Sequence, residues 1–392
     1  MILAHQIRLV PHAVQEDYLR RACGTARFVY NWALAKWKWL YEAGEKPNGR
    51  NLKKCFNTIK YKEFPWLKNI HRDAHAQPFV NLQRAFSNFF KKKAKYPKFK
   101  KKGCNDAFYV ANDKFEMDGR QIRLPKIGWI KTREELRFDG KIMGATVKRI
   151  ADAWFVAVQV DVGDVKKERV NNEIVGVDLG VKTSVILSTG EKIDGPKALR
   201  RAQKRLVRLS RQHVRKQKGS KNRAKLAMKL ARLHRRISWI RHDFLHKLTT
   251  RLCRENQTVV VEDLHVKGMM RNHKLARVIS DEGWGELRRQ LEYKAAIYGT
   301  KIVIADRWFP SSKRCSVCGE VKKEFLLSER EFVCESCGII LDRDENAALN
   351  LQQLGRVTSE VTLVDIEALA GRSWTGETLV DEARISTCAS GT

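Results

Sequence analysis

The chain has 392 residues, of which 43% are hydrophobic, and its 77 Lys and Arg against 44 Asp and Glu leave a formal net charge of +33. This composition excludes a disordered chain, and no apolar run approaches the roughly 18–20 residues of a membrane-spanning helix, so we expect two or three globular domains and no membrane partner. Because so much positive charge opposes folding unless a polyanion neutralises it, the expected partner is nucleic acid.

The first part of the chain is predicted to begin with a strand and to continue in helices. Residues 1–10 alternate weakly between apolar and polar side chains, which indicates a strand. From residue 11 to about residue 90 the apolar residues recur at helical spacing instead. Breaks between helices are expected at Pro47, Pro65 and Pro78.

Short alternating segments return between residues 107 and 162, punctuated by Gly and Asp, and they indicate further strands. A Lys-rich run at residues 91–103 separates them from the helices and mixes cationic with aromatic side chains, a composition suited to phosphate contact and base stacking. We therefore predict one β-barrel formed by residues 1–10 and 104–165, interrupted by a helical insertion at residues 11–103.

The second half is predicted to be α/β, because strands and helices alternate there. Residues 173–188 indicate a buried hairpin, and residues 197–252 indicate long basic helices. These helices share an apolar stripe formed by Leu206, Leu209, Leu226, Leu230, Leu233, Ile237, Ile240 and Phe244. The remaining expected elements are strands at 258–263 and 301–306 and helices at 284–298 and 344–354. Residues 356–392 are Ser/Thr/Gly-rich and acidic, which predicts a loosely ordered tail.

Three acidic residues occupy positions where a metal site would need them. Asp178 lies in a strand that should be buried, Glu262 ends an apolar strand, and Asp344 opens a helix. A buried carboxylate is costly to desolvate unless it is paired or bound to a metal, and oxygen ligands suit Mg²⁺ or Mn²⁺. Two such ions about 4 Å apart can activate a water and stabilise the leaving oxygen of a phosphodiester.

Each of these acids also has a structural interpretation. Asp344 is a favoured residue type for a helix N-cap, Glu262 is compatible with a solvated strand end, and Asp178 is compatible with a hairpin turn beside Gly180. Taken together, in a chain of this charge, the three acids favour the metal site.

Four of the nine cysteines form two CxxC pairs, Cys315 with Cys318 and Cys334 with Cys337, with 15 residues between the pairs. The N-terminus lacks a signal-peptide pattern, so we expect a cytoplasmic location, where such pairs bind metal rather than form disulfides. Four thiolates leave no open coordination position, which predicts one structural zinc.

Several segments, in order, resemble the RuvC-type nuclease core of TnpB, the transposon-encoded RNA-guided DNA endonuclease family related to type V CRISPR effectors: GVDLGVKTSVILSTG, VVVEDL, CSVCG with FVCESCG, and LDRDENAALNL. The likeness covers about residues 1–355 and includes residues 26–34 and 280–295. It implies a multidomain fold, α/β plus β. An RNase H-like (RuvC) core at residues 166–308 and 340–355 carries an inserted zinc ribbon at residues 309–339, and a wedge β-barrel with a helical recognition insertion precedes it.

The resemblance also implies roles. Asp178, Glu262 and Asp344 become catalytic ligands of magnesium; Asp342 competes for the third place, and Asp344 is preferred because it matches the family's acid directly before xNAA. The implied activity is cleavage of target DNA next to a short motif that the protein reads, guided by an RNA from the transposon end. The implied partners are this guide RNA and double-stranded and single-stranded target DNA, and the protein is expected to act as a monomer with its RNA.

Two other functions stay open. One is a nuclease-inactive, RNA-guided DNA-binding regulator on the same scaffold. The other is a transposase or accessory transposition protein, although no Tyr or Ser motif for a covalent DNA intermediate stands out.

Overall fold

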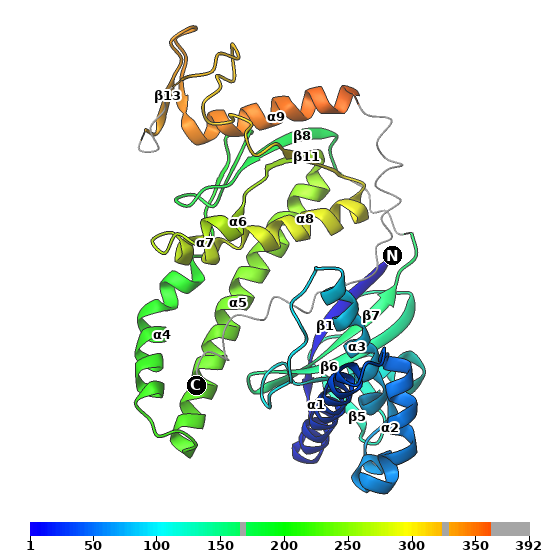
Figure 1. Ribbon diagram of the computed structural model, residues 1–392. Helices are drawn as coiled ribbons and strands as arrows, with labels where there is room; N and C mark the ends of the chain where they lie inside the picture. The colour runs from blue at the N-terminus through cyan, green and yellow to red at the C-terminus, as the bar shows by residue number, and fades with distance from the viewer. Residues whose placement is uncertain (165–169, 324–328, 362–392) are drawn as a thin grey trace. The chain divides into compact units, whose positions relative to one another are not determined.

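The computed structural model describes residues 1–164, 170–323 and 329–361, which belong to two compact units divided after Asp164 (Figure 1). In these ranges no helix combines the length and the apolar character that crossing a membrane requires.

The first unit contains a seven-stranded antiparallel sheet with the strand order β2-β6-β7-β1-β5-β4-β3. Its strands are β1 (Ile2–Val10), β2 (Ala107–Ala111), β3 (Glu116–Asp118), β4 (Gln121–Leu124), β5 (Gly128–Thr132), β6 (Lys141–Ile150) and β7 (Ala153–Asp161). The N-terminal strand is central, because β1 pairs with β7 from Ile2 to Leu9 and with β5 at its end. By strand pairing the sheet is open, with β2 and β3 as its edges, where the sequence predicted a barrel.

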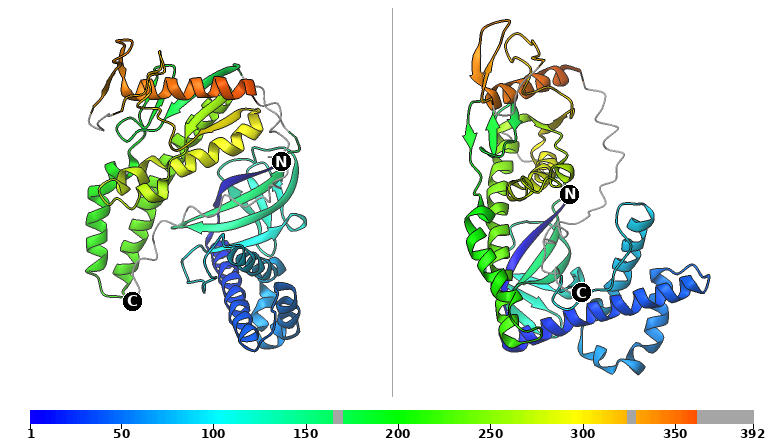
Figure 2. Two further views of the ribbon diagram at one scale, coloured as in Figure 1. Left: turned by 45° about the horizontal axis from the view of Figure 1, so that its top comes forward. Right: turned by 60° about the vertical axis from the view of Figure 1, so that its left-hand side comes forward.

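Three helices are inserted between β1 and β2: α1 (Ala13–Glu42), α2 (Gly49–Glu63) and α3 (Arg72–Phe90), with the 3-10 turn η1 (Pro65–Asn69) between the last two. Helix α1 joins two cores. Tyr18 and Leu19, in its first half, are buried against the sheet, whereas Leu34 and Trp37 are buried against α2 and α3. The right-hand view of Figure 2 shows α1 continuing well beyond the strands.

One expectation about this helical part is wrong. Pro78 does not end a helix but lies inside α3, where the buried neighbours Phe79 and Leu82 hold it in the core; this packing offsets the backbone hydrogen bond that a proline cannot make. Trp39, unlike the buried Trp37, is 56% exposed and lies under the Lys36 ammonium.

The second unit has a five-stranded sheet with the order β10-β9-β8-β11-β12. Its strands are β8 (Glu173–Asp178), β9 (Val185–Leu187), β10 (Lys192–Ile193), β11 (Asn256–Glu262) and β12 (Lys301–Ala305). Strands β8 and β9 form the predicted antiparallel hairpin. Strand β11 is parallel to both β8 and β12, and the helices between these strands provide the crossovers.

Helices cover both faces of this sheet. Alternation along β11 explains the layers: Val259 and Val261 face α5 (Lys221–Glu255) and α8 (Trp284–Tyr298), whereas Val260 faces α9 (Arg343–Val361). Figure 1 shows α9 on one side of β8 and β11, with α5 and α8 on the other. The remaining elements are α4 (Ala198–Val214), α6 (Val266–Met269), α7 (Ala276–Glu282) and the hairpin of β13 (Glu331–Val333) and β14 (Ile340–Asp342).

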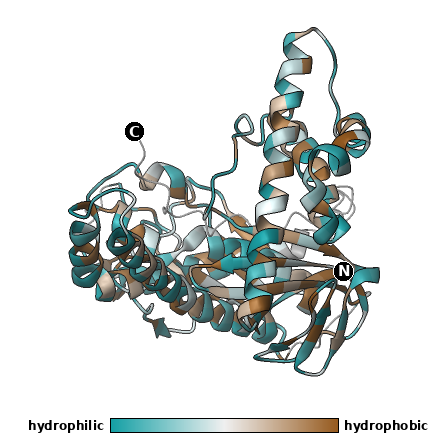
Figure 3. Cartoon of the chain, turned by 90° about the horizontal axis from the view of Figure 1, so that it is seen from below, coloured by the Kyte–Doolittle hydropathy of each residue, from teal (hydrophilic) through white to brown (hydrophobic). Residues whose placement is uncertain are grey.

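The predicted basic helices are α4 and α5, which pack as a pair through Leu209, Leu233 and Ile237. Hydrophilic and hydrophobic residues are mixed along the helices of the chain, as Figure 3 shows. Ile240, predicted in the stripe, is 40% exposed. Phe244 packs against the sheet core instead, because this part of α5 contacts the sheet rather than α4. Helix α9 continues to Val361, so residues 356–361 are not part of a tail; the rest of the predicted tail lies outside the described residues.

Candidate metal centres

Asp178 and Glu262 end the neighbouring strands β8 and β11. These strands are parallel, and Val177 is paired with Val261. The next residue of each strand therefore leaves the same edge of the sheet, which is how two acids far apart in the sequence become neighbours. The apolar strands hold them in a buried setting, and Asp178 is only 8% exposed.

Helix α9 carries Asp344 to this edge because it packs on β8 and β11. Gly176 permits the close approach, since a Cβ there would collide with the carbonyl of Ala348. The Gln352 Nε2 donates to the Ile174 carbonyl at 2.8 Å and holds the helix to β8. The charge of Asp344 acts on both strand-end acids, so the fold brings the three predicted carboxylates into one cluster.

The electrostatics of this acid cluster (Asp178, Glu262 and Asp344) favour a cation. Burial raises the pKa of Asp178 well above its usual value, and the charges of Glu262 and Asp344 raise it further. Burial also raises the pKa of Glu262; the Ser311 hydroxyl, which donates to Oε1 at 2.6 Å, opposes this rise, and Asp344 adds to it. Carboxylates that destabilise one another's charge are stabilised by a divalent cation with oxygen ligands.

The acid cluster is looser than a closed metal site. Among the His, Cys, Asp and Glu side chains of the described ranges, the only group of three or more whose ligand atoms all lie within 4.8 Å of one another is formed by four cysteines. Arg343 contacts Asp344 Oδ1 through Nε at 2.8 Å and Nη2 at 2.7 Å, and Arg330 Nη1 lies 3.6 Å from Oδ2. A metal ion would therefore compete with these guanidinium groups for Asp344.

Asp342 has a different role. Its Oδ1 accepts the backbone N–H groups of Asp344 at 2.9 Å and Glu345 at 3.2 Å, so it caps α9. Its Oδ2 pairs with Lys192 at 2.8 Å. Burial alone would raise the pKa of Asp342, but the bonds from Lys192 and the backbone lower it overall. The cap that the sequence offered as a structural interpretation of Asp344 thus belongs to Asp342.

The four predicted cysteines form the second centre. Cys315 and Cys337 have sulfurs 3.7 Å apart, and those of Cys318 and Cys334 are 3.5 Å apart. These separations exclude disulfides, whose sulfurs lie about 2.05 Å apart. They match a tetrahedron around zinc, because four Zn–S bonds of about 2.3 Å place the sulfurs about 3.8 Å apart. The glycines that end both turns, Gly319 and Gly338, have φ angles of 81° and 72°, which favour glycine.

The two centres are connected through α9. Asn346 Nδ2 donates to the Arg314 carbonyl at 2.7 Å, and its Oδ1 accepts the Ser316 N–H at 2.9 Å. Asn350, one turn later, donates to the carbonyls of Ser311 and Arg314 at 2.9 and 2.6 Å. Both amides are buried, so they fix the Cys315 turn beside the acid cluster.

Sequence reasoning missed four residues of this arrangement: Ser311, Arg343, Asn346 and Asn350. The asparagines carried a signal, because polar residues four apart on an otherwise apolar helix face mark a specific partner. Ser311 and Arg343 carried none, since only the folded chain places them against Glu262 and Asp344.

Three family models match this chain. They are "Probable transposase" (OrfB_IS605) at residues 157–273, "Cas12f1-like, TNB domain" at residues 284–351, and "Helix-turn-helix domain" (HTH_OrfB_IS605) at residues 1–46. Over the last of these ranges the structure has β1 and the single uninterrupted helix α1.

Curated relatives match almost the whole chain. A Streptomyces pristinaespiralis protein named "Putative RNA-guided DNA endonuclease" is 41% identical over 367 residues, which is 91% of this chain and 90% of that protein. "Putative RNA-guided DNA endonuclease InsQ" of Escherichia coli K12 is 35% identical over 370 residues, 90% and 92% of the two chains.

The fold has a counterpart among solved structures. The protein in the cryo-EM structure of a Cas12f1–sgRNA–target DNA complex superimposes with a TM-score of 0.58 at 17% identity, over 88% of this chain and 83% of that one, which shows a shared mixed α/β fold. On the near-full-length identity to its curated relatives, the chain belongs to the TnpB family of insertion-sequence proteins, the OrfB-type RNA-guided DNA endonucleases.

Proposed function

We propose that this protein is an RNA-guided DNA endonuclease of an insertion sequence, which hydrolyses target DNA beside a short protein-read motif with two divalent metal ions. Asp178, Glu262 and Asp344 would hold the ions, Mg²⁺ or Mn²⁺, which would supply an activated water and neutralise the charge that develops on the phosphate. The observation that carries the proposal is the convergence of these three acids at one sheet edge, where Glu262 and Asp344 raise the pKa of Asp178 and Asp344 also raises the pKa of Glu262.

In this proposal the domains keep their sequence-derived bounds. Residues 166–308 and 340–355 are an RNase H-like nuclease core, and residues 309–339 are a zinc ribbon whose Cys315, Cys318, Cys334 and Cys337 hold one structural zinc. Residues 1–10 and 104–165 are the wedge domain, and residues 11–103 are the helical recognition insertion. The hydrogen bonds of Asn346 and Asn350 support a ribbon that keeps target DNA beside the acids.

Basic surfaces support the nucleic-acid partners. Helix α4 exposes the cationic side chains of Arg200, Arg201, Lys204, Arg205, Arg208 and Arg211. In the first unit, a pocket of about 350 Å³ is lined by Arg20, Arg21, Arg27, Lys102, Asp106 and Arg149. The Arg149 Nε in this pocket is buried with no hydrogen-bond partner among the described residues. A phosphate of the guide RNA would satisfy it, since guanidinium groups bind phosphate oxygens strongly.

The nuclease-inactive regulator is the alternative. It needs the same basic surfaces but has no use for Asp178, whose burial beside two other acids destabilises the folded chain without a cation. The retention of the full acid cluster therefore favours the nuclease.

The test uses the full chain, produced with RNA from the transposon end. Sequencing of co-purified RNA should find one discrete species, and plasmid cleavage with Mg²⁺ should depend on a matching target. Alanine at Asp178, Glu262 or Asp344 should abolish cleavage while a gel-shift still detects target binding, because base pairing and backbone contacts carry affinity. A discrete RNA with no cleavage by the wild type would favour the regulator, and a covalent protein–DNA product would favour the transposase.

A further inference from the structure

The loop after β12 presents an exposed aromatic ring and ends at Ser311, which contacts Glu262 of the acid cluster. Trp308 is 85% exposed, although tryptophan is ordinarily mostly buried. The loop around it is anchored: the Trp308 N–H donates to Asp306 Oδ1 at 2.8 Å, Phe309 packs in the α9-side core, and Ser311 is buried against Glu262. The ring is therefore held out into solvent by a fixed backbone.

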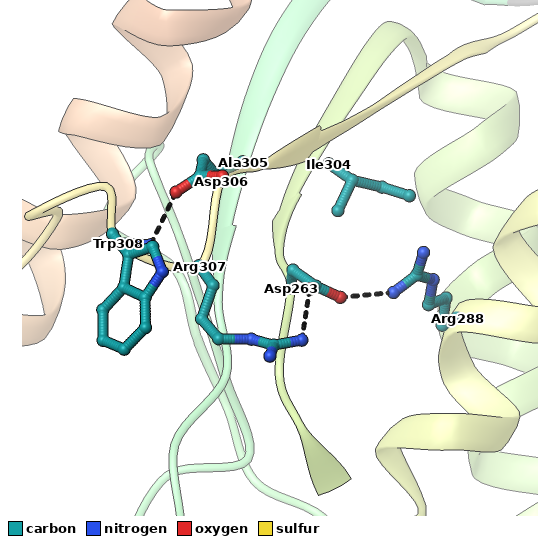
Figure 4. A pocket seen from close by; sticks show the side chains of 7 residues that line it. All are labelled: Asp263, Arg288, Ile304, Ala305, Asp306, Arg307 and Trp308. Carbon is teal, nitrogen blue, oxygen red and sulfur yellow. Dashed lines mark hydrogen bonds and ion pairs between the residues drawn. The ribbon is translucent and has the colours of Figure 1, made fainter.

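Trp308 lines a pocket of about 430 Å³ at the carboxyl ends of β11 and β12 (Figure 4), with Asp263, Arg288, Ile304, Ala305, Asp306 and Arg307. Asp263 joins the two guanidinium groups, accepting from Arg288 Nη1 at 2.7 Å and from Arg307 Nη2 at 2.8 Å. Two arginines face two aspartates, so the lining is balanced in charge and has no excess attraction for a phosphate.

The chemistry of this lining suits a flat, neutral group with polar edges. An exposed indole offers a stacking surface to any nucleobase, and the planar guanidinium and carboxylate groups offer donors and acceptors to the base edge. Side chains alternate across β11, so Asp263 faces the α8 side of the sheet and Glu262 the α9 side. At the end of β11 the pocket therefore lies on the opposite side of the sheet from the acid cluster. This position suits a base that flanks the scissile phosphate.

We propose that Trp308 stacks an unpaired nucleobase of the DNA strand next to the phosphate at the acid cluster, and so acts as a positioning residue for cleavage. The inference rests on the proposed nuclease function. The Asp306–Ser311 loop makes the link, because it carries Trp308 in the pocket and ends at the hydroxyl that binds Glu262. Stacking is tolerant of sequence, so the pocket would take any base.

The first experiment uses the RNA-bound protein in an Asp178→Ala background and single-stranded DNA with 2-aminopurine placed at successive positions. We expect quenching at one or two positions that Trp308→Ala removes and Trp308→Phe largely retains. Trp39→Ala, which removes another exposed tryptophan on α1, should leave the quenching unchanged. Quenching that survives in Trp308→Ala would overturn the proposal.

The second experiment measures cleavage in the Asp178 wild-type background. Trp308→Ala should lower cleavage about tenfold, within the range that one base stack contributes, with target binding by gel-shift unchanged and with Trp308→Phe restoring most of the rate. Equal loss in the Phe and Ala variants would indicate a structural role and contradict the proposal. If the wild type cuts no DNA, the nuclease function fails, but the aminopurine signal still decides whether Trp308 stacks a base. A signal confined to aminopurine in the guide RNA would also refute the assignment to DNA.

Discussion

Replacement of the two aspartates of the DRD sequence separates a helix cap from a metal ligand. Asp342→Ala removes the acceptor for two backbone N–H groups of α9, a change that costs about 0.5–2 kcal/mol. The exposed ion pair with Lys192 contributes about 0–1 kcal/mol more. For a unit of this size, a loss of about 1–2 kcal/mol of unfolding free energy lowers the melting temperature by roughly 2–8 °C. Cleavage should persist.

The matched control is Asp342→Asn, because asparagine caps a helix as well as aspartate. The free energy of unfolding of this variant should lie within about 1 kcal/mol of the wild-type value, since it loses only the surface ion pair with Lys192. Asp344→Ala should melt close to the wild type, because the loss of the Arg343 contact is offset by relief of the charge repulsion on Asp178. Its cleavage should fall at least about a hundredfold, since metal binding supplies several kcal/mol to the transition state.

The assays are thermal unfolding followed by circular dichroism and plasmid cleavage with Mg²⁺. Normal cleavage by Asp344→Ala together with loss in both Asp342 variants would show that Asp342 is the third ligand. A normal melting temperature for Asp342→Ala would refute the capping argument.

Three further predictions concern metal, burial and pH. Metal analysis of the purified protein should find about one zinc per chain, as a closed four-thiolate site implies, and Cys334→Ser should lose it; a Ser variant with full zinc and full activity would rule out the site. In the presence of chelator, Asp178→Asn should raise the melting temperature by roughly 2–4 °C, which corresponds to about 1 kcal/mol of unfolding free energy. The reason is that a carboxyl with a raised pKa in the folded state destabilises the protein once the pH exceeds the pKa of that carboxyl in the unfolded chain. No rise would mean that burial of this charge is compensated. Burial lowers the pKa of Lys294 from 10.5 to about 8, so the unfolded chain binds more protons than the folded chain between these two pH values. The wild type should therefore gain up to about 1.4 kcal/mol per pH unit over Lys294→Met above pH 8, as measured by urea unfolding, and parallel pH profiles for the two proteins would contradict the assignment.

Local sequence patterns predicted most of the secondary structure. The helix expected at residues 284–298 is α8 with the same bounds, and the hairpin expected at residues 173–188 is formed by β8 and β9. The grouping of the four cysteines was also predictable, because a short loop can bring two CxxC turns together without help from the rest of the chain. Pro78 was predicted wrongly, because packing of the helix around it outweighs its local preference.

What the sequence by itself determined was therefore the set of candidate acids and the elements that carry them. Spacing alone did not distinguish Asp342 from Asp344 as the third acid, because the two are separated by one residue and either could cap a helix. Tertiary structure decided which of them caps α9. Lys192 and the first turn of α9 engage Asp342, whereas the packing of α9 on β8 and β11 directs the charge of Asp344 at Asp178 and Glu262. These partners come from distant parts of the chain, so no local pattern reports them.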